Sequence, residues 1–197
     1  MSKFVGGPPE FKRFYPAKNA NKVNNVFDFY ISNDESVIYK KINKSGSSFS
    51  ERLRASKNQE DFVRILDGEF FLPLLRDYIC NGFDLEADGS HKMKFLHGYR
   101  LDLIGTYTID LLTARLMIEQ SGILLDRLTI ANESGAFFGD WATHNLVYSF
   151  EYGAIVNIDL EGFLTYNPVP KWANLEVCET WLKDVISQLN GLISSEE

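Results

Sequence analysis

The sequence predicts an α+β protein, in which a strand-rich first half precedes a second half framed by two helices. Three observations lead to this prediction. β-Branched and aromatic residues dominate short segments between residues 10 and 43. Two later segments, 106–128 and 173–193, repeat apolar residues at helical spacing. Between them, 145–160 contains two short apolar runs joined by a turn, which indicates a hairpin.

The first half should begin with three strands, at 10–15, 25–32 and 36–43. Turn-forming residues fill the connection SNDE at 32–35, so we expect the second and third strands to form a hairpin. Residues 50–66 then have helical character, and a break near 56–58 would divide them into two short helices.

Two further segments alternate apolar and polar residues as strands do, LPLLRDYICNGFDLE and KMKFLHGYRLDLI at 92–104, with the turn-rich ADGSH between them. The apolar repeat within 106–128 predicts the first long helix. We expect this helix to end near Gly122, because glycine is common just beyond the end of a helix. After the 145–160 hairpin, the prolines of NPVPKW mark a loop before the closing helix.

Composition narrows the class of protein. A formal net charge of -7 with no stripe of lysine and arginine argues against nucleic acid as the main partner. The two cysteines, Cys80 and Cys178, have no metal-type spacing, so we interpret them as reduced packing residues. We found neither a signal-peptide pattern nor an apolar run long enough to cross a membrane, and therefore expect a cytoplasmic protein.

Three polar residues gather around the 145–160 hairpin. Asp140 lies in a Gly-Asp loop before it, Asn145 begins its first strand and Asp159 ends its second. A hairpin can bring Asn145 and Asp159 to one edge, where an amide oxygen and a carboxylate suit Mg²⁺. Asp140 would then be free to orient or deprotonate a hydroxyl nucleophile.

These residues stand in the segments FGDWATHN and NIDLEG, which resemble the protein-kinase-like superfamily, and in particular its small-molecule branch of aminoglycoside and choline phosphotransferases. In that branch the catalytic loop commonly reads HGD, four residues and Asn, and the metal-binding aspartate follows a short hairpin. Phe138 replaces the usual histidine. Gly162 lies three residues after Asp159, so the DFG form of protein kinases is absent.

The resemblance implies a bilobal protein-kinase-like fold. Residues 1–97 would form an antiparallel-sheet N-lobe, and 98–197 a shortened, mainly helical C-lobe. It also implies ATP and Mg²⁺ as cofactors, Asp140 as catalytic base, and Asn145 and Asp159 as metal ligands.

The resemblance further requires a lysine on the third strand to contact the nucleotide phosphates. Lys40 and Lys41 both qualify, and strand alternation places Lys40 with Ile38 but Lys41 with Tyr39. Aminoglycoside phosphotransferases often carry an aromatic residue two positions before this lysine, where it stacks on adenine. The resemblance therefore favours Lys41 with Tyr39.

Two more parts of a nucleotide site follow from the resemblance. Glu60, on the helix expected at 50–66, would pair with the lysine, with Glu51 as the alternative. The hinge would lie at 97–100, where the backbone of His97 and Gly98 would bind the adenine edge. The loop at 17–25 lacks the glycine-rich pattern of protein kinases.

The expected activity is ATP-dependent phosphoryl transfer to a hydroxyl of a small molecule, sugar or glycan. No Ala-Pro-Glu motif occurs and only 160–197 follow Asp159, which leaves no room for the subdomain that docks protein substrates. A non-catalytic nucleotide-binding or scaffold protein on the same fold is the alternative. A small C-lobe could also expose an apolar face that a second subunit of a homodimer covers.

Two neighbours of these residues have more ordinary interpretations. We expect Trp141 to be a packing residue beneath the catalytic loop and not a substrate platform. His144 should order the loop or face substrate, because His91 and His97 form no metal-type cluster with it.

Overall fold

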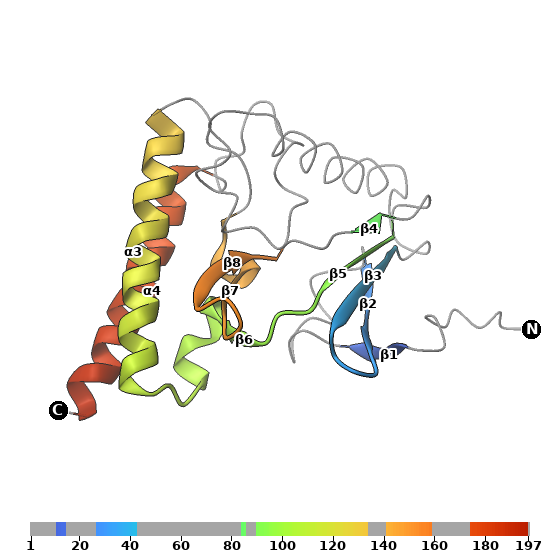
Figure 1. The fold of residues 1–197 in the computed structure, drawn as a ribbon. Coiled ribbons are helices and arrows are strands. Elements are labelled where there is room, and N and C mark those ends of the chain that lie inside the picture. Colours follow the sequence, from blue (N-terminus) through green and yellow to red (C-terminus); the bar gives the residue numbers. More distant parts are fainter. Residues whose placement is uncertain are drawn as a thin grey trace, which may run out of the picture. The chain divides into compact units, whose positions relative to one another are not determined.

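The computed structural model describes residues 11–14, 27–42, 84–85, 90–133, 141–158 and 174–196. Within these ranges the protein is α+β, as predicted, and contains two antiparallel sheets and two long helices (Figure 1). The chain divides into two compact units, and in the described residues the first unit ends at Phe95 and the second begins at Leu96.

The first unit is built on a five-stranded sheet in which every neighbouring pair of strands is antiparallel. The strands occur in the order β1-β2-β3-β5-β4. The three strands predicted in the first half are confirmed as the first three of this sheet. Their bounds are β1 Phe11–Phe14, β2 Phe27–Ser32, β3 Val37–Ile42, β4 Asp84–Leu85 and β5 His91–Lys94.

The hairpin predicted between β2 and β3 is confirmed, and its turn is held by side-chain oxygens. The Asp34 carboxylate accepts hydrogen bonds from the hydroxyls of Ser32 and Ser36, at 2.5 and 2.8 Å. The backbone N–H groups of Ser36 and Val37 donate to the Ser32 hydroxyl at 3.1 and 3.0 Å. The hydrogen bonds that the Asp34 carboxylate accepts, from the Ser32 hydroxyl first and then from the hydroxyl and N–H of Ser36, lower the pKa of Asp34 from 3.8 to about 2.

The second unit combines a three-stranded antiparallel sheet, in the order β6-β7-β8, with two long helices. The predicted hairpin and closing helix are confirmed as β7, β8 and α4. The bounds are β6 Gly98–Arg100, 3₁₀ helix η2 Leu101–Thr106, α3 Leu111–Glu133, 3₁₀ helix η3 Thr143–Asn145, β7 Leu146–Ser149, β8 Ala154–Asn157 and α4 Leu175–Glu196.

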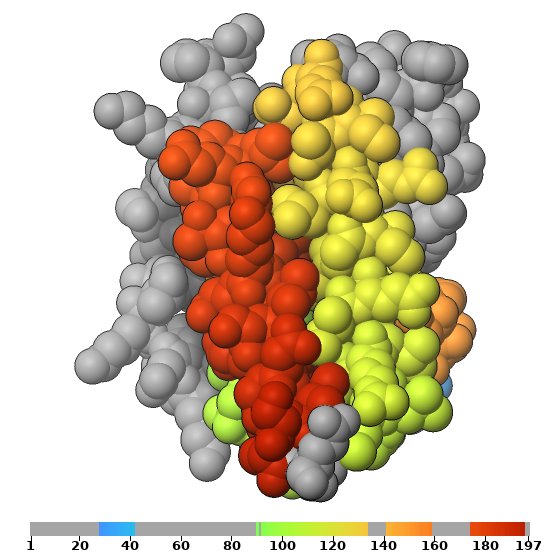
Figure 2. Space-filling view, turned by 90° about the vertical axis from the view of Figure 1, so that its left-hand side faces the viewer, coloured from blue at the N-terminus to red at the C-terminus, as the bar shows by residue number. Residues whose placement is uncertain are grey.

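Helices α3 and α4 pack side by side along their apolar stripes (Figure 2). In both helices the buried residues recur every three or four positions, which is the spacing of one helix face. Together with residues of η2 and the β7–β8 hairpin they form one core. The buried helix residues are Ala114, Met117, Ser121, Leu124, Leu128 and Ala131 in α3, and Cys178, Leu182, Val185 and Leu189 in α4.

Each long helix begins with a side-chain cap. Asp110 accepts hydrogen bonds from the Thr113 N–H at 2.9 Å and from its hydroxyl at 2.7 Å, and these bonds lower the pKa of Asp110. The Asn174 side chain accepts the Val177 N–H at 2.9 Å. Both arrangements satisfy backbone donors that a helix start leaves without a partner.

The prediction that the first long helix ends near Gly122 is wrong, because α3 continues to Glu133. The apolar stripe continues beyond the glycine with Leu124 and Leu128, both fully buried. A glycine inside a helix costs only about 1 kcal/mol relative to alanine, which this burial outweighs.

The strand pattern read at 92–104 is correct only in part. Strand β5 ends at Lys94, residues 95–97 are neither strand nor helix, β6 covers Gly98–Arg100, and the chain from Leu101 folds as the 3₁₀ helix η2. Leu101 and Ile104 are both buried in the core of the second unit. The two residues are three positions apart, which is the repeat of a 3₁₀ helix. In a short apolar segment the sequence does not distinguish this repeat from the alternation of a strand.

Among the helices that the structure describes, none combines the length and the apolar character needed to cross a lipid bilayer. Helix α3 carries charged side chains such as Arg115, Glu119 and Asp126 along its length. Within the described residues, this agrees with the expectation that the chain has no membrane span.

Candidate functional site

The described residues include five of the positions predicted to form the site. These are Tyr39, Lys41, His97, Gly98 and Asn145. Asp140, Asp159 and Glu60 lie outside the described residues, as does the alternative Glu51. The described segment 141–158 nevertheless starts directly after Asp140 and ends directly before Asp159. The structure therefore gives the backbone that follows Asp140 and the backbone that precedes Asp159.

Asn145 occupies the junction between η3 and β7. Its N–H donates to the Ala142 carbonyl at 2.8 Å, and its own carbonyl accepts the N–H of Ile158 at 2.8 Å. The residue is 5% exposed. The hairpin therefore closes with Asn145 hydrogen-bonded to Ile158, the residue that immediately precedes Asp159.

The turn at the other end of the hairpin sets this register. Gly153 has a φ of 59°, a left-handed conformation that glycine adopts without strain. Its N–H donates to the Ser149 carbonyl at 2.9 Å, while the Ser149 hydroxyl accepts the N–H of Tyr152 at 3.4 Å. From this turn the ladder runs back to the pair Leu146 and Asn157, next to Asn145.

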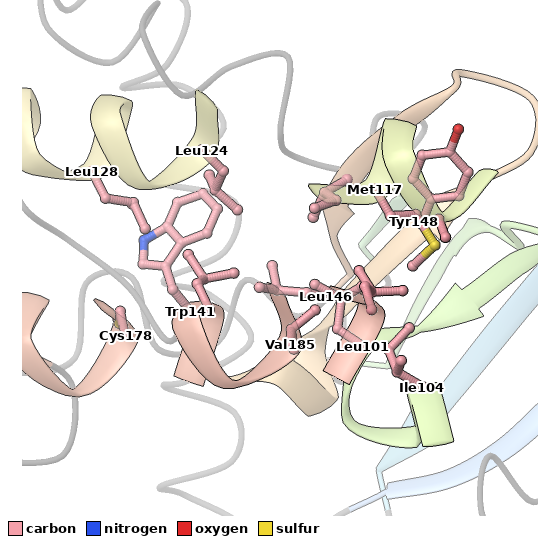
Figure 3. Close-up of a cluster of buried hydrophobic side chains, with 14 of the residues drawn as sticks. Leu101, Ile104, Met117, Leu124, Leu128, Trp141, Leu146, Tyr148, Cys178 and Val185 are labelled. Carbon is pink, nitrogen blue, oxygen red and sulfur yellow. The ribbon is translucent and has the colours of Figure 1, made fainter. Parts of the chain in front are cut away.

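Trp141 anchors the start of the segment. Its side chain is 0% exposed and belongs to the core of the second unit. Figure 3 shows the indole beside Leu124 and Leu128 of α3, with Cys178 of α4 close by. The prediction that Trp141 is a packing residue is confirmed, and the anchor holds the chain directly after Asp140.

One face of the hairpin packs on the helices. Leu146, Tyr148 and Ile155 share this face and are part of the core. Figure 3 shows Leu146 and Tyr148 among the other core side chains. Burial, and to a smaller extent the charge of Asp110, raises the pKa of the Tyr148 phenol, which stays neutral at physiological pH. His144 of η3 is exposed, and so is accessible from solvent.

Asn157 also lies on this apolar face, directly opposite Leu146, and is 0% exposed. Asn157 was assigned no role from the sequence. The signal that could have identified it is an amide at an inward position of a strand whose other inward residue, Ile155, is apolar.

The segment predicted as an adenine-binding hinge is the edge strand β6 and the residue before it. The His97 carbonyl accepts the N–H of Phe150 at 2.9 Å, and the His97 side chain is exposed. A Cβ added at Gly98 would overlap the backbone carbonyl oxygen of Tyr148 and lie 2.8 Å from Cγ1 of Val147. Gly98 is therefore required for the close approach of β6 to β7, whether or not it also contacts a nucleotide.

Ring contacts and an ion pair fix the chain that follows this glycine. The Tyr99 ring lies 4.9 Å from the Tyr107 ring and 4.8 Å from the Phe150 ring, measured between centroids. The Arg100 guanidinium donates two hydrogen bonds to Asp102, at 2.7 and 2.5 Å, which raise the pKa of Arg100. The segment is thus held at fixed geometry on the core of the second unit.

In the first unit, Tyr39 and Lys41 share one face of β3, as strand alternation requires. Tyr39 is only 5% exposed. Its ring lies 6.2 Å from the Tyr30 ring, and the Lys92 ammonium is 5.8 Å from its centroid. Much of the ring surface that could stack on adenine is thus in contact with protein, and the stacking role remains a prediction.

Lys40 lies on the opposite face of β3, with Ile38. It is 6% exposed, and its ammonium group is 5.9 Å from the centroid of the Phe29 ring. Lys41 is only half-buried and lies opposite Asp28 in the β2–β3 pair. The two lysines that the sequence left as alternatives therefore differ in environment, and Lys40 is the more enclosed.

The donor set at the hairpin is chemically suited to Mg²⁺. Asn145 offers a neutral amide oxygen, and Asp140 and Asp159 would offer carboxylates at the two positions that flank the described segment. Within the part of the chain that the structure describes, no three histidine, cysteine, aspartate or glutamate side chains gather into a metal-binding group. A metal at this site would therefore need the acids next to Trp141 and Ile158.

Comparison with known proteins assigns no family to the chain. No model of a known protein family matches it, and no curated protein matches it significantly. The function of the site has to be inferred from its own residues.

Proposed function

We propose that this protein is an ATP- and Mg²⁺-dependent phosphotransferase, with a bilobal protein-kinase-like fold, that phosphorylates a hydroxyl group of a small molecule, sugar or glycan. The observation that supports this most strongly is the closure of the β7–β8 hairpin, in which Ile158 donates to the carbonyl of Asn145. This bond brings one candidate metal ligand next to the position that carries the other, Asp159.

Each polar residue of the motif has one role in this proposal. The Asn145 amide oxygen and the Asp159 carboxylate hold the metal, and Asp140 accepts the proton of the attacking hydroxyl. Bound Mg²⁺ supplies charge neutralisation for the transferring phosphoryl group. The buried Trp141 supports the proposal because it fixes the backbone beside Asp140, and positioning is the main catalytic contribution in such reactions.

A lysine of β3 contacts the nucleotide phosphates in this proposal. Lys41, with Tyr39 and Glu60, is the set that the resemblance favours. We therefore propose Lys41 as the phosphate contact and keep Lys40, the more enclosed of the two lysines, as the alternative to be tested against it.

The adenine base would bind along β6. This strand is at the edge of its sheet within the described residues. Alternate backbone groups of an edge strand point away from its neighbour and can hydrogen-bond a ligand. Gly98 would supply these groups, because the carbonyl of His97, the other residue expected at the hinge, already accepts the N–H of Phe150.

The test is transfer of label from γ-³²P-ATP to a panel of amino alcohols, sugars and glycans. The wild-type protein should phosphorylate at least one of them in the presence of Mg²⁺. Asp159→Ala should lose both Mg·ATP turnover and metal-dependent binding, whereas Asp140→Ala should keep nucleotide binding and lose transfer. Asp126→Ala, which removes an exposed aspartate of α3, is the matched control and should leave transfer unchanged.

The outcomes separate the candidate functions. Undiminished transfer by both variants would contradict the assigned roles. Binding of Mg·ATP without transfer to any acceptor would favour a non-catalytic nucleotide-binding or scaffold protein, a candidate supported by the loop at 17–25, whose sequence lacks the glycine-rich pattern of protein kinases. Absence of nucleotide binding would contradict both functions.

A further inference from the structure

Helix α3 carries apolar side chains on two faces. One face packs in the core of the second unit. On the other face Leu112 is 69% exposed, Leu116 is 39% exposed and Ile130 is 43% exposed. Together with the half-buried Ile123, these residues follow one another at intervals of four, seven and seven positions, which places them along one side of an α-helix. We call these four residues the outer stripe of α3.

Helix α4 shows how a face of a long helix in this protein meets water. It is one residue shorter than α3, and in its described part every exposed residue is polar, charged or glycine. Single apolar residues at a protein surface are common, whereas a continuous row of them marks a contact surface. The contrast between the two helices therefore indicates that the outer stripe of α3 is such a surface.

The charges beside the outer stripe indicate which partner it fits. Arg115 and Asp126 are eleven positions apart, close to three helical turns, so both lie along the same edge of the stripe, with Glu119 between them. Arg115 follows Leu112 by three positions, and Asp126 precedes Ile130 by four. One end of this edge is therefore positive and the other negative, which makes the stripe complementary to a reversed copy of itself.

We propose that the outer stripe is the interface of a homodimer, in which α3 of two copies packs antiparallel about a two-fold axis. In such an interface the same surface is used by both copies, so every contact occurs twice. When Leu112 of one copy lies beside Ile130 of the other, Arg115 of each copy comes within one residue of the level of Asp126 of the other. Both charges are then on the same side of the helix pair, and two identical ion pairs form.

Other arrangements of the two helices do not give these pairs. In a parallel pair, Arg115 and Asp126 would stay about 16 Å apart along the helix axis. The proposed dimer does not rest on the proposed function, and neither residue of the ion pair takes part in the proposed transfer. Loss of the dimer should therefore leave phosphoryl transfer unchanged.

Sedimentation equilibrium of the full chain measures the dimer. A single helix pair in contact over about 27 Å is small for a dimer interface, so we expect a dissociation constant on the order of 10 µM. Leu112→Glu and Ile130→Glu place charges within the stripe, and each should weaken the dimer by at least about 10-fold. Because both side chains are exposed, circular dichroism should show an intact fold. Ser187→Glu, which adds the same charge at an exposed position of α4, is the matched control and should dimerise as the wild type does.

Charge reversal tests the antiparallel arrangement. Arg115→Glu and Asp126→Arg should each weaken the dimer by at least about 3-fold, because each turns two ion pairs into two like-charge pairs. The double variant should restore the wild-type dissociation constant, and the distance of about 16 Å between the two residues within one helix means that this rescue arises between copies.

Three results would overturn the inference and leave the proposed function intact. The first is a wild-type protein that is still monomeric at about 200 µM, well above the expected dissociation constant. The second is a dimer that both glutamate variants of the stripe leave unchanged. The third is a double reversal that dimerises no better than the single reversals, which would exclude the antiparallel pairing.

Discussion

The backbone N–H of Ile158 donates a hydrogen bond of 2.8 Å to the carbonyl oxygen of Asn145. This bond closes the β7–β8 hairpin at the end where the chain continues to Asp159. Because it uses only backbone atoms, a substitution of the Asn145 side chain leaves both of its partners in place. The fold of the hairpin and the ligand role of Asn145 can therefore be tested separately.

Asn145→Ala should weaken Mg²⁺ binding in the presence of nucleotide by at least about 10-fold, because it removes an oxygen ligand. Asn145→Asp should restore most of this affinity, since a carboxylate oxygen takes the place of the amide oxygen. Isothermal titration calorimetry of each folded variant measures the effect. Equal Mg²⁺ affinity in the alanine variant and the wild-type protein would show that Asn145 is not a ligand.

Replacing the lysine that contacts the phosphates should lower kcat/KM for ATP by roughly 100-fold, because one charged donor to the transferring group is lost. We expect this loss for Lys41→Met, and a change of less than about 3-fold for Lys40→Met. Steady-state kinetics with varied ATP compares the two. A large loss confined to Lys40→Met would instead support Lys40 as the phosphate contact.

Gly98→Ala should destabilise the second unit by at least about 1–3 kcal/mol, because the new methyl group would overlap the Tyr148 carbonyl oxygen. Gly122→Ala is the matched control. Among the described residues, no atom outside the adjoining helix backbone lies within 4 Å of a Cβ added there, and alanine is favoured inside a helix by about 0.5–1 kcal/mol, so this variant should be more stable than the wild type. Urea denaturation monitored by tryptophan fluorescence measures both changes. Unchanged stability in Gly98→Ala would mean that β6 does not approach β7 this closely.

The Asp34 turn should make the stability of the β2–β3 hairpin depend on acid pH. The folded-state pKa is lowered from 3.8 to about 2, so ionised Asp34 stabilises the fold above pH 3.8, and this contribution is lost as the pH falls through about 2. Asp34→Ala should be less stable than the wild type at pH 6, with the difference vanishing near pH 2. Urea midpoints by circular dichroism across this range measure it, and a difference that does not change with pH would contradict the assignment.

Much of the secondary structure could be predicted because its signals are local. Strand alternation at 36–43 and the apolar repeat after Leu175 depend only on neighbouring residues, and both predictions are confirmed. The helix end at Gly122 was wrong because the glycine is a local signal, whereas the burial of Leu124 and Leu128 in the core favours continuation of α3 past it.

The site was less predictable because it depends on contacts between distant segments. Strand alternation predicts that Lys40 and Lys41 lie on opposite faces of β3. Which of the two faces is more buried depends on the segments that pack over the sheet. The close approach of Gly98 to Tyr148 arises only when β6 pairs with β7. The burial of Asn157 was not predicted, because asparagine is not a residue type that indicates burial.

The central claim is that this protein binds ATP through a metal held by Asn145 and Asp159. Calorimetric titration of ATP into the metal-free protein, with and without Mg²⁺, tests it most directly, and Asp159→Asn is the comparison variant. The account predicts that Mg²⁺ strengthens ATP binding to the wild-type protein by at least about 10-fold and has little effect on the variant. Equal ATP affinity of the wild-type protein with and without Mg²⁺, or no ATP binding at all, would contradict it.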